Sequence, residues 1–118
     1  MIINDHVNRN ELAERLDHDM ILLRELVNLF ASDSCLVLDR IRSAIERGDS
    51  TALRKEAHTL KGSVLNFSAH QAYEIALQLE NAGRAGNLSE SPEIYNILAV
   101  EIQQVRDALN NLIAENEL

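Results

Sequence analysis

Residues 53–67 read Leu-Arg-Lys-Glu-Ala-His-Thr-Leu-Lys-Gly-Ser-Val-Leu-Asn-Phe, and this stretch decides the fold class. Its apolar positions, separated by gaps of 4, 3, 4 and 3 residues, are Leu53, Ala57, Leu60, Val64 and Phe67. Gaps that alternate between four and three residues place these side chains on one face of a helix, as the buried seam of a helix bundle requires. The sequence therefore predicts a helix over 50–67 in an all-α protein.

The same helical spacing extends over almost the whole chain, without the sustained alternation of a strand. The predicted helices span 9–16, 20–47, 50–67, 70–83 and 92–115. The second is either kinked at Ser32-Asp33-Ser34 or continuous, with these residues on an exposed face. Four long amphipathic helices with short linkers predict an antiparallel up-down four-helix bundle, and the short N-terminal helix should lie across one end.

Polar residues provide the start signals of three of these helices. Asp19 precedes the second helix, and either Asp49 or Ser50 precedes the third. Ser91 followed by Pro92 predicts a capping hydroxyl and a proline in the first turn of the last helix.

The composition fits one helical domain over 1–118 and disfavours several other classes. The chain has 118 residues, of which 46% are hydrophobic and 3% aromatic, with four Gly and one Pro. This length can bury one core, and so few turn-forming residues argue against a β-sandwich. With 19 acidic and 11 basic residues the net charge is -8, which disfavours nucleic acid as a partner.

The single cysteine and the N-terminal pattern favour a reducing compartment. Cys35 cannot form an intrachain disulfide, and its apolar neighbours predict a small core residue. The first residues lack the pattern of a signal peptide, and the apolar stretch 20–30 is too short to cross a membrane. We therefore expect a soluble, cytoplasmic domain without direct membrane contact, either alone or as the cytoplasmic end of a membrane-bound sensor kinase.

His58 points away from the buried face of its predicted helix. Lys61 and Gly62 follow it at the spacing of helix neighbours, and Arg54 and Lys55 lie one turn before it. A mid-helix Gly costs about 1 kcal/mol relative to Ala, and close approach of another molecule is one reason to keep it there. From this pattern alone, a nucleophile that accepts a phosphoryl group among cations and an ordinary surface histidine remain about equally supported.

Ala57-His58-Thr59-Leu60-Lys61-Gly62-Ser63 closely resembles the central motif of histidine-containing phosphotransfer (HPt) domains, the shuttles of multi-step phosphorelays. Three further stretches, 16–30, 41–49 and 79–86, resemble the family in the same order along the chain. The resemblance therefore covers nearly the full sequence, and this ordered set is far more specific than the central motif alone.

The resemblance implies that His58 is the phospho-acceptor, that Lys61 is the cation beside the phosphoryl group, and that Gly62 leaves room for a partner's active site. The phosphoryl group would come from the phosphoaspartate of a receiver domain and pass to the aspartate of another. The expected partners are receiver domains of response regulators and of a hybrid histidine kinase. The domain would be a monomer without ATP-dependent kinase activity and without a cofactor, since Mg²⁺ is expected on the receiver.

Arg54, Lys55 and Leu65 are the expected docking residues. Leu65 projects within about 20° of His58 on the helix, so it either contacts a partner's helix or packs under the N-terminal helix. The chain departs from the family at Asp17-His18, where a Gly pair is common, and at Leu65 and Ser68, where a small residue and Gly are common.

Two other functions remain open. The first is a helical interaction adaptor without phosphotransfer, and the second is the phospho-accepting domain of a chemotaxis-type histidine kinase. His6, His18 and His70 form no recognisable metal-ligand pair with His58, and we expect each of the three to be solvated.

Overall fold

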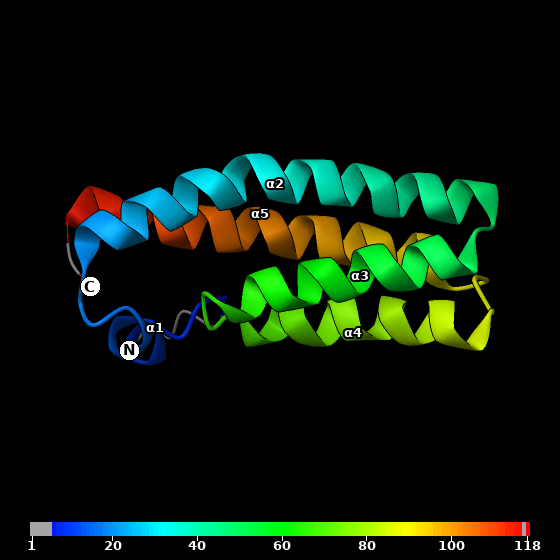
Figure 1. Ribbon diagram of the computed structural model, residues 1–118, viewed down its shortest axis with the longest axis horizontal. Coiled ribbons are helices and arrows are strands. Elements are labelled where there is room, and N and C mark those ends of the chain that lie inside the picture. Colours follow the sequence, from blue (N-terminus) through cyan, green and yellow to red (C-terminus); the bar gives the residue numbers. More distant parts are fainter. Residues whose placement is uncertain (1–5, 117) are drawn as a thin grey trace.

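The computed structural model describes residues 6–116 and 118, and this part of the chain contains five helices and no strand. The helices are α1 (Arg9–Arg15), α2 (Met20–Arg47), α3 (Ser50–Leu65), α4 (His70–Ala85) and α5 (Ser91–Glu115). The four long helices run antiparallel, and α1 lies across one end (Figure 1). The predicted up-down four-helix bundle with a short N-terminal helix is confirmed.

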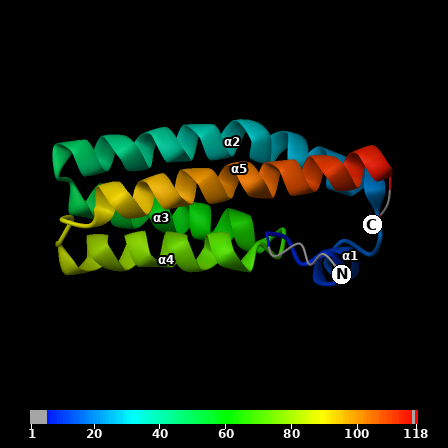
Figure 2. The ribbon, with the colours of Figure 1, turned by 180° about the vertical axis from the view of Figure 1, so that it is seen from behind.

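Each long helix packs against two neighbours, since α2 and α4 both contact α3 and α5. The helices α3 and α5 therefore lie on opposite faces of the bundle, as the view from behind shows (Figure 2). No helix in the described residues is long and apolar enough to cross a membrane.

The core consists of the apolar stripes that the sequence spacing predicts. On α3 and α5 the fully buried side chains are Leu53, Ala57, Leu60, Val64, Leu98, Ile102, Val105 and Leu109. Full burial of one such large side chain stabilises the fold by roughly 1.5–3 kcal/mol, so these two stripes fix how both helices are rotated in the bundle. The opposite face of α3 is consequently left towards solvent.

Side-chain caps form at two of the three predicted helix starts. Asp19 and Asp49 each accept a hydrogen bond from the backbone N–H three residues later, which confirms Asp19 and selects Asp49 rather than Ser50. The predicted cap at Ser91 is wrong. The capping position of α5 is Glu90, without a side-chain hydrogen bond, and the Ser91 hydroxyl is buried in the first turn.

The α2 helix is continuous through Ser32, Asp33 and Ser34, but two expectations for this stretch are wrong. Ser34 is buried rather than on an exposed face, and Cys35 is exposed rather than in the core. The physical reason is the helical period: Ser34 lies four residues before the buried Leu38, so both face the core, and the next residue is rotated by about 100°.

Two helix ends differ from the predicted bounds by two residues. The helix α3 ends at Leu65, two residues early, because the chain turns at Ser68, whose φ is +54°. The helix α4 continues through Gly83 to Ala85 and ends where Gly86 adopts a left-handed conformation with φ +72°.

Gly83 is needed for close packing between α3 and α4. A Cβ atom at this position would lie 2.7 Å from the backbone nitrogen of Arg54 and 2.7 Å from the backbone oxygen of Ser50. Any larger residue would have to push the two helix backbones apart. Because glycine has no side chain, Gly83 allows the short distance between α3 and α4 on which the site described below depends.

Four residues other than glycine adopt the left-handed backbone region that favours glycine: Asp17, His18, Ser68 and Asn116, with φ of +54°, +57°, +54° and +52°. At Asp17, His18 and Ser68 the family that the sequence resembles commonly has glycine. The carbonyl of Ser68 accepts a hydrogen bond of 3.0 Å from the backbone N–H of Asn8, which joins the N-terminal segment to the turn after α3.

We predict that Ser68→Gly stabilises the fold by about 0.5–1 kcal/mol. The left-handed region costs a residue with a side chain roughly 1–2 kcal/mol, and glycine regains this, less its greater freedom in the unfolded chain. Urea unfolding of the variant and the wild type measures the difference. Ser68→Ala also removes the buried hydroxyl but keeps the strained φ, so an equal gain in both variants would contradict the backbone explanation.

Candidate functional site

His58 lies on the outward face of α3, and 66% of its side chain is exposed. Its ring is nevertheless oriented, because Nδ1 lies 3.1 Å from the Oε2 atom of Glu80 on α4. The other ring nitrogen, Nε2, has no protein partner among the described residues. The imidazole is therefore fixed through one nitrogen while the other is accessible.

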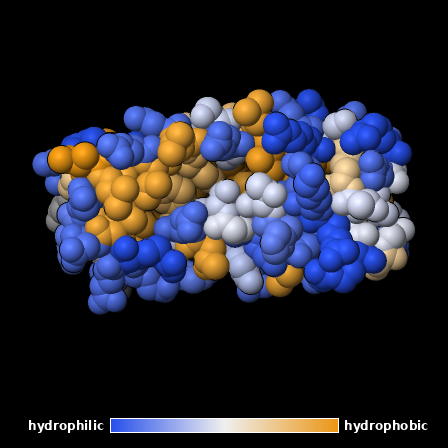
Figure 3. Space-filling view, viewed as in Figure 1, coloured by the Kyte–Doolittle hydropathy of each residue, from blue (hydrophilic) through white to orange (hydrophobic). Residues whose placement is uncertain are grey.

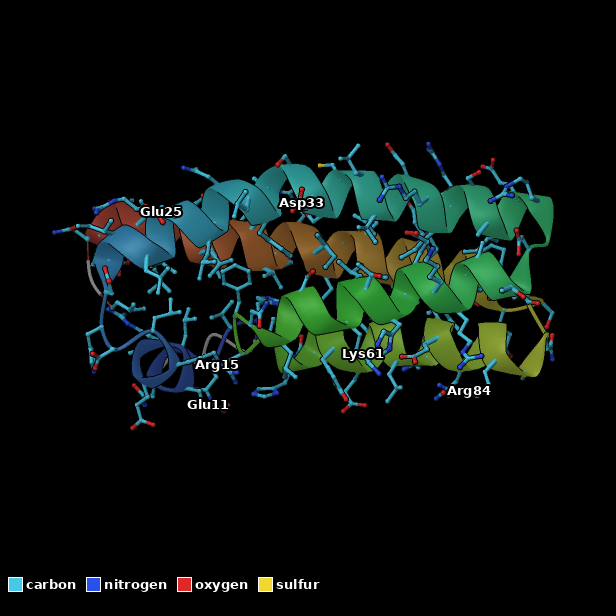
Figure 4. The ribbon with its side chains drawn as sticks, in the orientation of Figure 1. Glu11, Arg15, Glu25, Asp33, Lys61 and Arg84 are labelled. Atoms are coloured by element: carbon cyan, nitrogen blue, oxygen red, sulfur yellow. The ribbon has the colours of Figure 1, made fainter. Side chains whose placement is uncertain are left out.

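Glu80 is the centre of the site. Only 5% of its side chain is exposed, and three groups approach its carboxylate. Besides the His58 ring, Lys61 Nζ lies 2.7 Å from Oε1, and Arg84 Nη2 lies 3.1 Å from Oε2. Figure 4 labels Lys61 and Arg84 on the side of the bundle where α3 packs on α4. One buried carboxylate thus connects two helices and three nitrogen-bearing side chains.

The helix spacing explains why Glu80 is buried. It follows the buried Ala76 by four residues and precedes Gly83 by three, so all three lie on the face of α4 that meets the bundle. The close approach at Gly83 brings Glu80, one turn away, within reach of α3. We did not predict Glu80 or Arg84 as site residues. The available signal was an acidic residue on an otherwise apolar helix face.

The surroundings of Glu80 lower the pKa of its carboxyl below the ordinary value of 4.5. The hydrogen bond from Lys61 is the largest cause; burial opposes it, and the hydrogen bond from His58 and the charges of both groups lower the pKa further. Glu80 is therefore ionised at neutral pH, and an ionised carboxylate can only accept hydrogen bonds. Nδ1 of His58 must then carry the ring proton, which leaves the lone pair on Nε2.

Lys61 and Arg84 are held differently beside this carboxylate. Lys61 is 17% exposed, and its ammonium also lies 5.7 Å from the centre of the Tyr73 ring. Arg84 is 52% exposed and additionally donates a hydrogen bond to Asn81. Lys61 is thus a mostly buried charge close to the ring, whereas the guanidinium of Arg84 extends into solvent.

Gly62 lies one turn from His58, and a Cβ atom placed there would have no neighbour within 4 Å. The space beside the imidazole is thus open. Leu65, at the end of α3, is 36% exposed, so it is not covered completely by the N-terminal helix.

Arg54 and Lys55 lie on the other side of His58 and help to line an open cavity of about 450 Å³. The lining residues are Thr51, Arg54, Lys55, His58, Thr59, Glu80 and Arg84. Of the six predicted site residues, the structure brings Arg54, Lys55 and His58 to this cavity. Lys61 and Gly62 lie next to His58, whereas Leu65 lies two turns along the helix.

The other three histidines, His6, His18 and His70, hydrogen-bond elsewhere in the chain. His6 Nδ1 lies 2.8 Å from the buried carboxylate of Glu101, so this ring is not simply solvated as expected. His70 and His18 are exposed. Nε2 of His70 donates a hydrogen bond to the carboxylate of Glu11, and Nδ1 of His18 donates one to the backbone carbonyl of Leu118. Within residues 6–116 and 118, no three potential metal ligands are grouped closely enough to hold an ion.

We predict that Glu80→Gln destabilises the fold by about 1–3 kcal/mol at neutral pH, because it leaves Lys61 without its buried counter-charge. A carboxyl whose pKa is lowered by folding stabilises the folded state at pH values above its ordinary pKa of 4.5. This contribution is lost as the pH falls through the lower folded-state value. The difference between variant and wild type should therefore shrink on acidification.

Urea unfolding over a pH series measures this difference. Glu74→Gln is the matched control, since it removes an exposed carboxylate from the same helix and should change stability little at any pH. A gap between Glu80→Gln and the wild type that stays constant down to acid pH would show that the charge of Glu80 is not what stabilises the site.

Comparisons with known proteins point to one family. The Hpt domain family model matches residues 25–115. Among solved structures, the chain is similar to histidine-containing phosphotransfer protein B (HptB) from Pseudomonas aeruginosa PAO1, with a TM-score of 0.87, 26% identity, and coverage of 93% of this chain and 96% of that one.

The chain also shares its fold with the HPT domain of a sensor hybrid histidine kinase from Shewanella, with a TM-score of 0.79 at 14% identity. That alignment covers 96% of this chain and 97% of the other. The search of curated proteins gave no match. Since the family model spans most of the chain, including the helix that carries His58 and the helix that carries Glu80, this chain belongs to the Hpt domain family.

Proposed function

We propose that His58 accepts a phosphoryl group from the phosphoaspartate of a receiver domain and that this domain passes it to an aspartate of another receiver. The observation that carries the proposal is the state of the His58 ring. Its Nδ1 is engaged by a buried carboxylate, and its Nε2 faces solvent next to the open space at Gly62. Membership of the Hpt family supports a histidine phosphotransfer role in phosphorelays.

The transfer is a substitution at phosphorus. The lone pair of Nε2 attacks the phosphoryl group, the bond between phosphorus and the aspartyl oxygen breaks, and that oxygen leaves with the electron pair as a carboxylate on the receiver. Lys61 and Arg84 lie on the same side of the bundle as the ring, and their charges would offset the charge of the moving phosphoryl group. A charge-assisted contact of this kind contributes about 1.5–3 kcal/mol.

The division of labour between the partners follows from the groups available here. This chain supplies a positioned nucleophile and cations, whereas the receiver would supply the aspartate and its Mg²⁺. We propose that the domain needs no cofactor of its own, has no ATP-dependent kinase activity, and acts as a cytoplasmic monomer.

The surface around His58 supports docking of a protein domain. Arg54 and Lys55 form a basic edge on one side, and these two cations are exposed on a chain whose net charge is -8. Leu65 lies on the other side, where Figure 3 shows hydrophobic residues gathered over the first half of α2 and the adjoining surface. There Leu22 is 37% exposed and Leu26 borders a hollow between α2 and α3. A receiver would thus contact apolar surface at one side of His58 and positive charge at the other.

We predict that His58→Gln abolishes phosphoryl uptake from a ³²P-labelled receiver, whereas His70→Gln retains it. Both variants remove one imidazole from an exposed helix position, so they differ only in which ring is lost. Label that persists in His58→Gln would refute the assignment. Labelling of the wild type by an ATP-binding kinase domain, but by no receiver, would favour the chemotaxis-type kinase. Receiver binding without any labelling would favour the adaptor.

We also predict that Gly62→Gln slows transfer strongly while the fold is kept or slightly stabilised. The new side chain would occupy the open space beside the ring, and the helix penalty of glycine, about 1 kcal/mol, would be removed. Gly62→Ala should have the same effect on stability but a smaller effect on the transfer rate, because its side chain ends at Cβ. Equal transfer rates for the wild type and a folded Gly62→Gln would show that the gap has no role in docking.

A further inference from the structure

The contact between His58 and Glu80 has a consequence for the phosphorylated state. We propose that the Glu80 carboxylate keeps the proton on Nδ1 of phosphorylated His58, so that phosphoryl transfer in either direction needs no proton from solvent. This inference rests on the proposed function, because it concerns the ring after His58 has been phosphorylated. It makes Glu80 a positioning residue that acts through the histidine and does not touch the phosphoryl group.

The atoms and charges balance without an additional reactant. During loading, the Nε2–phosphorus bond forms and the bond from phosphorus to the aspartyl oxygen breaks, while the proton on Nδ1 stays where it is. The ring thereby becomes an imidazolium with one positive charge, and its Nδ1–H points at a carboxylate 3.1 Å away. During unloading to a second aspartate, the electron pair of the Nε2–phosphorus bond returns to Nε2. The ring leaves as the neutral imidazole that was present at the start.

The surroundings of Glu80 keep this carboxylate ionised and in place. Lys61 and His58 approach it from α3 and Arg84 approaches it from α4, and these are the charged or titratable groups in contact with it. Lys61 and Arg84 bring positive charge to the carboxylate from both helices. Because the contacts with Lys61 and His58 lower the pKa of the Glu80 carboxyl despite its burial, Glu80 is not expected to take the ring proton for itself. The carboxylate can therefore act as a constant negative charge beside a ring whose own charge changes.

Without that charge, a phosphorylated imidazole would exchange its proton with solvent near neutral pH. A ring that has lost the proton must leave as an anion, which is a much poorer leaving group, or wait to be protonated again. The amide of a glutamine at position 80 could still accept the hydrogen bond from Nδ1–H, but it carries no charge. Glu80→Gln therefore separates the charge of this residue from its shape.

The experiment loads the full chain with phosphoramidate, a small chemical phosphodonor, so that loading does not depend on a receiver. A response-regulator receiver domain with Mg²⁺ is then added, and the rate of phosphoryl loss from the protein is measured from about pH 6.5 to about pH 8.5. The wild type should show a nearly flat profile. In Glu80→Gln the rate should approach the wild-type rate at the acid end and fall by up to about tenfold for each pH unit above it.

Glu74→Gln, which loses a carboxylate from the exposed side of the same helix, should keep the flat profile. A Glu80→Gln profile that is flat, or lower by a constant factor at every pH, would overturn the proposal, because a purely structural role would give that result. Nitrogen-15 NMR of the loaded wild type tests the same point without any variant. Nδ1 should be protonated at about pH 8, and an unprotonated Nδ1 would refute the inference even if Glu80→Gln failed to fold.

The same experiment separates this inference from the proposed function. If loaded wild-type protein transfers to no receiver at any pH, the relay role fails, while the NMR measurement still decides whether Glu80 retains the ring proton. If transfer occurs and the Glu80→Gln profile stays flat, the relay role stands and the role of Glu80 is refuted.

Discussion

The buried carboxylate of Glu80 is the interaction on which the arrangement of the site depends. A carboxylate removed from water costs several kcal/mol unless it is paired and hydrogen-bonded, so α3 must present donors at this point of the interface. Lys61 and His58 meet that requirement from one helix and Arg84 meets it from the other. Gly83 is part of the same constraint, because a side chain there would hold the two backbones too far apart.

The helical period allows α3 to serve the core and the site together. Leu53, Ala57, Leu60 and Val64 are fully buried, and their packing fixes the rotation of the helix about its axis. That rotation places His58 and Gly62 on the outward side of the helix. Around the helix axis, His58 lies about 100° from the buried Ala57, and Gly62 lies about 200° from the buried Leu60. The nucleophile is therefore positioned by hydrophobic packing on the far side of its own helix, with little freedom left for the backbone that carries it.

Much of this could be read from the sequence, because it depends on spacing within single helices. The bundle, the outward direction of His58 and the open space at Gly62 all follow from the period of 3.6 residues. Glu80 and Arg84 were missed because their roles depend on the distance between two helices, and residues 22 and 26 positions away from His58 show no local pattern that links them to it. Cys35 was misplaced for a related reason: apolar neighbours in sequence do not decide which side of a helix a residue occupies.

An exposed nucleophile has two requirements that conflict. A partner's active site must reach His58, which demands exposure, yet the ring must hold one tautomer and one orientation, which exposed side chains rarely do. Each of the two ring nitrogens meets one requirement. Nδ1 contacts the carboxylate of Glu80, whose side chain is 5% exposed, and this contact orients the ring. Nε2 is left accessible on a His58 side chain that is 66% exposed. Because the orienting group is buried and the reacting atom is not, docking of a partner can change the solvent around Nε2 without disturbing the contact that determines which nitrogen reacts.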